Sequence, residues 1–251
     1  RARDDEDVKL TWTDLRATGR VSALENIMSD IRYRADGAVV MGDTTTVTSS
    51  SVAPTSDLRR VTATNSRDVM GWAFDGDINM TLALPLAPTL IFGYAYGSGD
   101  DGQGQDTSFH QPDLRGNSSR QGDSTGASHN YGEALRPDLT NLHIVKAGIG
   151  IPVMKASDIM MTYRYYLLDH KETGLSNSHV SASVTGASHS LGQGLDLIYN
   201  MKLNEEFPVM QNLPASTALR ISLGAFKSGN AYGVADDEDS FRGTVDLKLS
   251  F

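Results

Sequence analysis

The last eleven residues of the chain, 241–251, alternate between apolar and polar side chains. Phe241, Val245, Leu247, Leu249 and Phe251 share one parity, and charged or hydroxyl side chains fill the other. Successive side chains of a strand point to opposite faces, so this pattern predicts a strand with one apolar and one polar face. Its length fits the roughly 9–11 tilted residues that cross a bilayer. A single strand of this kind would suit a soluble sandwich, whereas a membrane β-barrel repeats it.

The alternation recurs along the chain. Eight further segments show it, which with the last gives nine expected strands: 8–21, 28–41, 72–84, 89–97, 142–151, 159–167, 195–203, 219–225 and 241–251. In the first segment the apolar parity changes between Trp12 and Leu15, which predicts a β-bulge near Thr13 and Asp14. Trp12, Trp72, Tyr94, Tyr96 and Tyr165 are expected in an aromatic girdle at the membrane interface.

The connections between these segments alternate in length. Long polar connections (43–67, 98–138, 169–190 and 229–239) interleave with shorter ones (23–27, 85–88, 152–157 and 204–214). Short periplasmic turns opposite long external loops are typical of outer-membrane barrels. The sequence therefore predicts an all-β fold: one domain, 1–251, that forms an antiparallel transmembrane outer-membrane β-barrel.

Composition is compatible with this fold without requiring it. The 251 residues can fill one large all-β domain, and the net charge of −9 suits a soluble protein or a barrel equally. Cysteine is absent, which excludes disulfides and thiolate metal sites. No apolar run reaches about 18 residues, so no transmembrane helix is expected.

The strand count is odd. If Phe251 ends on the periplasmic side, nine crossings place the first residue outside the cell, whereas bacterial single-chain barrels have an even number of strands. The chain is therefore expected to be the C-terminal part of a longer barrel, or one of two pieces. The alternative is one misread strand, which would give a small barrel of eight or ten strands.

Several motifs resemble the alginate-export outer-membrane porin family. They lie in the same order along nearly the whole chain: LTW (10–12) with ATG (17–19), YAYGSG (94–99), HNYGEALRPDLTNLH (129–143), GQGLDLIY (192–199) and FKSGNAYG (226–233). The resemblance covers only the second half of that family's eighteen-stranded barrel. It implies an anionic, alginate-like polysaccharide as substrate and places Arg220 where the family carries a pore arginine. Ser222 stands where a second arginine is expected.

The alternation also assigns charges to the lumen. Eleven cations are expected there: Lys9, Arg16, Arg20, Arg32, Arg34, Lys146, Arg164, Lys202, Arg220, Arg242 and Lys248. Five acids oppose them: Asp36, Asp75, Asp77, Asp196 and Asp246. A basic pore selects anions, so we expect Arg32, Arg34, Lys146, Arg164, Lys202, Arg220, Arg242 and Lys248 to line the substrate path. In the alternative interpretation, the pairs Arg32–Asp36, Arg164–Asp196 and Arg242–Asp246 neutralise one another.

Other candidate sites carry weaker signals. The family's long periplasmic turn implies a gate at 204–214, where Glu205 and Glu206 could reach inward cations, although an ordinary solvated turn explains them as well. Asp236, Asp237 and Asp239 are weak Ca²⁺ candidates because they lack EF-hand spacing, and a solvated loop is favoured.

No enzymatic activity and no cofactor are predicted. His143 has lipid-facing parity at an external strand end, where a barrel lipase would place its histidine. No serine pairs with it on that face, so an interfacial histidine is favoured.

The predicted function is a porin that exports an anionic polysaccharide by diffusion. Expected partners are outer-membrane lipid and lipopolysaccharide, the polysaccharide itself, the missing N-terminal half of the barrel and periplasmic export components, and no nucleic acid. The alternative is a non-conducting barrel that sheathes or anchors a periplasmic partner.

Overall fold

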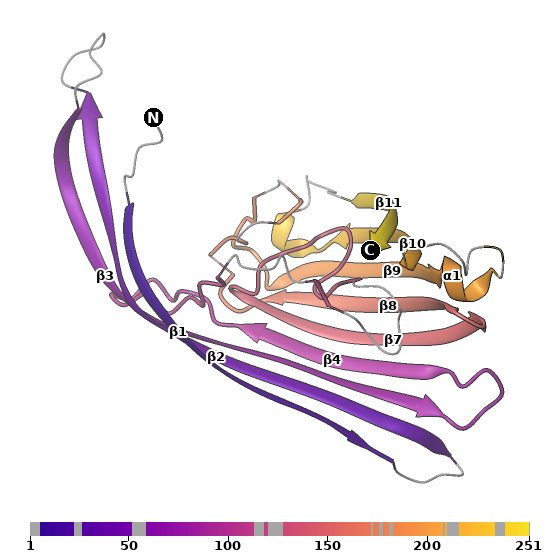
Figure 1. Ribbon diagram of the computed structural model, residues 1–251. Helices are drawn as coiled ribbons and strands as arrows, with labels where there is room; N and C mark the ends of the chain where they lie inside the picture. Colours follow the sequence, from indigo (N-terminus) through magenta and orange to yellow (C-terminus); the bar gives the residue numbers. More distant parts are fainter. Residues whose placement is uncertain are drawn as a thin grey trace.

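The computed structural model shows an all-β chain. It describes residues 6–22, 27–51, 59–112, 118–119, 128–171, 173–175, 178–180, 183–207, 209, 216–233 and 239–250. Nine antiparallel strands form one curved sheet in which each strand pairs with its neighbours in sequence order (Figure 1). They are β1 (Glu6–Val21), β2 (Met28–Ser51), β3 (Arg59–Leu82), β4 (Thr89–Gly97), β7 (Leu142–Met154), β8 (Ser157–Leu168), β9 (Ser190–Lys202), β10 (Ser216–Ser228) and β11 (Ser240–Ser250).

The remaining elements are small. Strands β5 (Ser118–Ser119) and β6 (Ser128–His129) pair with each other between β4 and β7. A helical turn α1 (Leu203–Glu206) follows β9, and a 3-10 turn η2 (Asn230–Tyr232) follows β10. Neither described helix could span a membrane. The nine expected strands of the main sheet are thus confirmed, and the other elements belong to its connections.

The hairpin of β2 and β3 is longer than predicted. Each strand has 24 residues, so 43–51 and 59–67, predicted as loop, belong to strands. Polar composition suggested a loop, but threonine is β-branched and suits an extended strand. Cross-strand hydroxyl pairs add to the ladder, as where Thr45 lies opposite Ser66 with their oxygens 3.3 Å apart. This hairpin extends beyond the rest of the sheet (Figure 1).

The first strand has no bulge, so the predicted irregularity near Thr13 and Asp14 is wrong. β1 pairs with β2 in unbroken register from Glu6 to Val21. Trp12 lies opposite the fully buried Val40, and its indole N–H donates to the carbonyl oxygen of His110 at 2.7 Å. Trp12 therefore faces the loops on the inner side of the sheet.

The apolar residues of β1 thus divide between two faces. Leu10 also packs against the inner core, whereas Lys9 shares the parity of the exposed Leu15 and so lies on the outer face rather than in the lumen. The predicted change of parity arose because apolar side chains were assigned to lipid throughout, whereas loops cover this part of the inner face.

The two faces of the sheet differ as the alternation predicted. Large apolar side chains of the outer face are exposed, including Trp72 at 53%, Val145 at 50% and Leu223 at 53%. The inner face carries most of the charged side chains of the strands, and of these Arg164 and Asp196 are almost completely buried. A face of exposed apolar side chains opposite a polar one is the pattern of a strand between lipid and a lumen.

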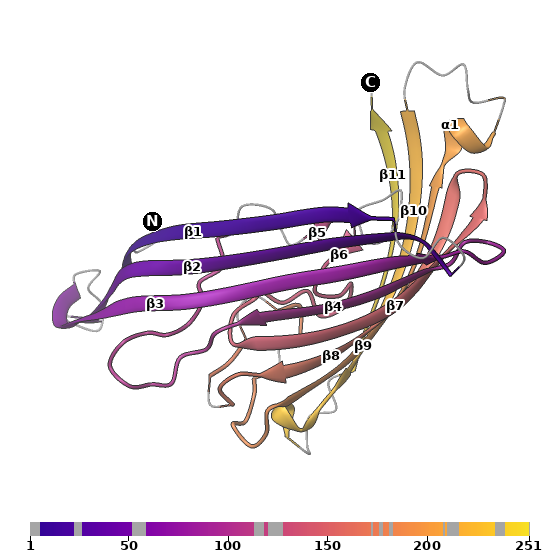
Figure 2. The ribbon, with the colours of Figure 1, turned by 90° about the horizontal axis from the view of Figure 1, so that it is seen from below.

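Loops cover the inner face near the end of the sheet where the long connections lie. Apolar side chains of the connections, among them Phe109, Leu135 and Tyr232, join inward residues of the strands such as Ile144 and Phe226 in one buried cluster. Figure 2 shows these connecting segments beside the curved sheet, grouped near one end of the strands. The part of the lumen next to these strands is therefore filled by protein.

The short connections lie at the other end. The predicted turn 152–157 is tighter than expected, because β7 continues to Met154 and β8 begins at Ser157. A register shift between Pro152 and Met154 accommodates Pro152, which has no N–H to donate to the ladder.

Strands β1 and β11 form the two edges of the sheet, and each pairs with one neighbour only. The nine-stranded antiparallel sheet, with its outer apolar face, is consistent with half of a β-barrel.

Candidate functional site: a charged belt on the inner face

Charged side chains form a continuous row across the inner face, from β2 to β10. We call this row the charged belt. It comprises Arg34, Asp75, Asp77, Glu133, Arg136, Lys146, Arg164, Asp196 and Arg220.

One end of the belt joins strands β2, β3 and β7. The Arg34 guanidinium donates from Nη2 to the carboxylates of Asp75 at 2.7 Å and Asp77 at 3.0 Å. Lys146 forms an ion pair with the same Asp77 from the far side of β4. The intervening Gly93 makes this bridge possible, since a Cβ there would lie 2.4 Å from Asp77 Oδ1 and 2.6 Å from Lys146 Cε.

The other end joins β8, β9, β10 and a loop. Arg164, fully buried, forms an ion pair with Asp196 on the neighbouring strand. Asp196 also accepts hydrogen bonds from the backbone N–H of Glu133, at 3.2 Å to each carboxylate oxygen. The Glu133 side chain pairs with Arg220 of β10 and, at 3.0 Å, with Arg136.

The loop between β4 and β7 supplies Glu133 through residues 129–136, which we call the inward segment. Its carbonyl groups accept hydrogen bonds from the wall: Asn130 from Arg164 Nε at 3.1 Å, and Tyr131 from the Tyr166 hydroxyl at 2.9 Å. Gly224 of β10 allows the close approach, because a Cβ there would lie 2.8 Å from the Glu133 Cβ. The inward segment is thus fixed to three strands of the sheet.

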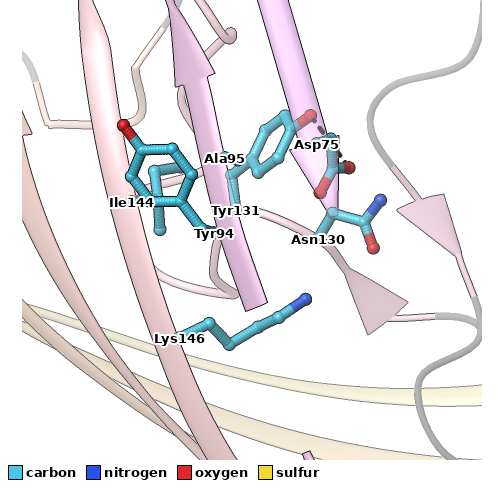
Figure 3. A pocket seen from close by; sticks show the side chains of 7 residues that line it. All are labelled: Asp75, Tyr94, Ala95, Asn130, Tyr131, Ile144 and Lys146. Carbon is cyan, nitrogen blue, oxygen red and sulfur yellow. Dashed lines mark hydrogen bonds between the residues drawn. The ribbon is translucent and has the colours of Figure 1, made fainter. Parts of the chain in front are cut away.

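A small cavity lies where the inward segment meets the belt. Asp75, Asn130, Tyr131 and Lys146 are among its lining residues (Figure 3). The Tyr131 hydroxyl points to Asp75 and donates to its carboxylate at 3.4 Å. The strands and the loop therefore both contribute polar groups to the cavity, beside the apolar Ala95 and Ile144.

Glu133 is ionised although its side chain is only 2% exposed. Burial opposes the charge, but the hydrogen bond from the His129 backbone N–H and the positive charge of Arg220 outweigh it and lower the pKa of the carboxyl below its ordinary value. Its carboxylate therefore balances positive charge in the belt at neutral pH.

The predicted pore residues divide between the belt and its surroundings. Arg34, Lys146, Arg164 and Arg220 come together in the belt. Four others lie outside it: Arg32 pairs with Asp30 at 2.8 Å, Lys202 with Glu205 at 2.9 Å, Arg242 donates to His179 at 2.9 Å, and Lys248 is exposed on β11.

Of the three ion pairs of the alternative interpretation, Arg164–Asp196 is the one found among the described residues. Asp36 pairs with Arg16 at 2.6 Å and lies 3.6 Å from Arg34, instead of pairing with Arg32. Asp246 lies 3.9 Å from Arg220 on the neighbouring strand, instead of pairing with Arg242 on its own. Most of the predicted pore cations nevertheless pair with an acidic side chain, as the alternative interpretation expected.

Among the charged residues of the inner face that were missed from the sequence are Asp30, Glu133 and Arg136. Asp30 lies just beyond the clearest alternation of β2, next to a register shift between Met28 and Asp30. Glu133 and Arg136 lie in a loop, where strand alternation cannot assign a side chain to either face. The signal for them was the motif HNYGEALRP, which places charged and aromatic residues within a connection otherwise rich in Gly and Ser.

The described part of the candidate gate, 204–207 and 209, lies at the opposite end of the strands from the inward segment, and the rest of 204–214 lies outside the described residues. Besides its pair with Lys202, Glu205 is largely exposed, and Glu206 accepts a hydrogen bond from the Ala156 backbone N–H at 2.8 Å. A gating role for both stays a prediction.

The weak metal candidates lie after β10. Asp236 and Asp237 are outside the described residues, while Asp239 accepts a hydrogen bond from the Ser228 backbone N–H at 3.2 Å. Within the described part of the chain, no group of three potential ligands could hold a metal ion.

His143 lies on the outer face, with both imidazole nitrogens engaged. Nδ1 is 2.7 Å from the Tyr94 hydroxyl, and Nε2 is 3.3 Å from an Asp169 carboxylate oxygen. The ring of Tyr96 lies 4.6 Å from the His143 ring and 4.4 Å from that of Trp72. These residues form the aromatic cluster expected of an interfacial girdle, whereas Trp12, predicted in the same girdle, faces inward.

An exposed apolar outer face, a charged inner face and antiparallel neighbour-to-neighbour pairing define the class of transmembrane β-barrels. The sequence profile described as alginate export matches residues 1–246, and the chain belongs to that family.

Curated relatives are similar over most of the chain. The alginate production protein AlgE of Pseudomonas aeruginosa is 27% identical over 97% of this chain and 49% of its own length. The proteins of the same name from Pseudomonas syringae and Azotobacter vinelandii are each 26% identical, over 74% and 73% of this chain and 39% and 40% of theirs. The chain thus spans about half the length of the curated relatives it matches, or less.

Proposed function

We propose that the chain forms part of the wall of an outer-membrane porin through which an anionic, alginate-like polysaccharide leaves the cell by diffusion. The observation that carries this proposal is the charged belt, where five cations meet four acids on the inner face. The family's description, alginate export, and the relatives' name, alginate production protein, support the substrate class.

The pairing of the belt suits passage better than tight binding. A carboxylate in contact with one cation gains roughly 1–4 kcal/mol, depending on the local dielectric. Because the belt's cations already have acidic partners, the attraction left for a passing carboxylate is smaller. Conduction requires binding strong enough for entry and weak enough for exit, and a series of partly neutralised cations meets both conditions.

More exposed arginines stand beside the belt on β1 and β2. The side chains of Arg16, Arg20 and Arg32 are 66%, 64% and 40% exposed, and each is paired with Asp30 or Asp36. A guanidinium presents several N–H donors and can bind a further carboxylate with those that face away from its partner. In the proposed pore these arginines, with Lys202, Arg242 and Lys248, line the path on either side of the belt.

A second candidate function is a barrel that anchors a periplasmic partner without conducting. The inward segment favours it, because this segment and its neighbouring loops cover much of the inner face. The two candidates differ in whether space for a sugar chain remains once the full set of strands surrounds the lumen.

Conductance of the full-length protein in planar bilayers tests the proposal. A KCl gradient should give a reversal potential of anion-selective sign, and oligouronates should block the current. Neutral oligosaccharides of equal length provide the matched control and should block far less. Cation selectivity, or equal block by neutral sugars, would contradict the porin proposal. A properly folded but non-conducting protein would favour the anchoring role.

A further inference from the structure

We infer that Glu133 is a specificity-determining residue of this pore: a fixed counter-charge that keeps Arg136 and Arg220 from holding a passing carboxylate too tightly. The inference rests on the proposed function and deepens it. Its basis is the position of one loop carboxylate between two arginines on the inner face.

The exposure of the three side chains shows how they are layered. Glu133 is 2% exposed, whereas Arg136 and Arg220 are 16% and 17% exposed. The guanidinium groups thus keep some contact with the surroundings while the carboxylate is shielded. A ligand that approaches this group meets the two guanidinium groups with the Glu133 carboxylate behind them, and the exposed Asp246 carboxylate lies 3.9 Å from Arg220.

Glu133 cannot easily leave this position, because the backbone around it is bonded to the wall. Its own N–H donates to Asp196, and the carbonyls of Asn130 and Tyr131 accept bonds from Arg164 and Tyr166. These groups come from strands β8 and β9, which carry Arg164 and Asp196 of the belt. Glu133 is therefore a permanent part of the wall and not a side chain that a substrate displaces.

The local charge shows what the carboxylate does. Arg136, Arg164 and Arg220 contribute three positive charges, and Asp196, Glu133 and the more distant Asp246 contribute three negative ones. Without the charge of Glu133 the cluster would have a net charge of plus one instead of zero. Binding of a polyanion would strengthen, and release, which sets the rate of passage through a multi-site pore, would slow.

The test is the time for which a short oligouronate blocks single channels of the full-length protein. Glu133→Gln keeps the shape and an acceptor oxygen while removing the charge. We expect the mean blocked time to rise about fivefold, the effect of a unit charge about 4 Å away screened by water. Glu133→Asp, which keeps the charge, should stay near the wild-type value. Asp101→Asn, in an exposed part of the same loop, is the matched control and should change nothing.

The outcomes separate this inference from the proposed function. Wild-type channels that oligouronates do not block would overturn both. Wild-type channels that are blocked, with an unchanged or shorter blocked time in Glu133→Gln, would overturn the inference alone. If Glu133→Gln does not assemble, Arg136→Gln gives the opposite test: the blocked time should fall, and an unchanged time would count against the inference.

Discussion

Arg164 is a fully buried arginine whose guanidinium group is held by an ion pair and by backbone carbonyls. Asp196 neutralises it, and the carbonyl oxygens of His129 and Asn130 accept bonds from the rest of its guanidinium group. Removing one partner of a buried ion pair is costly, since the other charge stays buried without compensation. Pairs in contact with water are worth far less.

Asp196→Asn should therefore destabilise the protein by about 3–5 kcal/mol, because it leaves Arg164 buried without a counter-charge. Arg16→Gln is the matched control. It breaks a pair whose arginine side chain is 66% exposed, which should cost about 0–1 kcal/mol. Denaturant unfolding of the two variants in the same detergent measures both, and equal losses would mean that burial does not govern the strength of these pairs.

Among the elements, the connection after β4 is hydrogen-bonded to the sheet at several points of its described length. Asp106 forms a short ladder with β3, where its N–H donates to the Asp68 carbonyl and its carbonyl accepts from the Met70 N–H. Its side chain accepts bonds from the Ser108 N–H and from His110, each at 2.9 Å. These bonds overcome the opposing effect of burial and lower the pKa of Asp106 to about 2.

Low pH should destabilise the hydrogen bonds that Asp106 forms in this part of the loop. Because the folded pKa of Asp106 lies below its ordinary value of 3.8, its contribution to stability is present above about pH 4 and is lost as the pH falls towards 2. Hydrogen exchange at residues 106–110 should accelerate over that range while the β7 and β8 amides stay protected. Asp106→Asn should show the faster exchange already at pH 7, and protection that persists in this variant would refute the explanation.

The sequence predicted the strands far better than the loops, for a physical reason. Period-two alternation reports directly on a sheet with one face in lipid, so the nine strands and their order could be derived. It assumes, however, that the inner face meets water. That assumption fails at Trp12 and Leu10, because loops pack against these side chains. Glu133 was missed because strand alternation assigns no face to a residue in a loop. Tertiary contacts of the connection between β4 and β7 decide both.

At the scale of the whole molecule, the two tryptophans of the chain lie on opposite faces of the sheet. Trp72 lies in the exposed aromatic cluster of the outer face, and Trp12 donates to a loop carbonyl on the inner face. If the outer face contacts lipid, only one of the two indoles should meet acyl chains.

Fluorescence quenching in vesicles tests this orientation. The variants Trp12→Phe and Trp72→Phe each retain one of the two tryptophans of this chain, in a background where any tryptophan elsewhere in the full-length protein is replaced by phenylalanine. Brominated lipids should quench the emission of the protein that retains Trp72 and leave the protein that retains Trp12 nearly unchanged. Unbrominated lipid of the same headgroup is the control. Equal quenching in both variants would show that the two faces are not separated by the membrane as the exposure pattern indicates.

Gly93 lies beneath the ion pair that joins Lys146 to Asp77 across β4, and this arrangement limits how the strands can align during assembly. The inward positions of β4 on either side of it hold Ile91 and Ala95. A slip of β4 by two residues would preserve the inside-outside alternation, so hydrophobicity alone would not reject it. It would, however, bring a side chain under the bridge and force the ion pair apart. The lack of a side chain at position 93 thus favours one strand register over the others that keep the same alternation of faces.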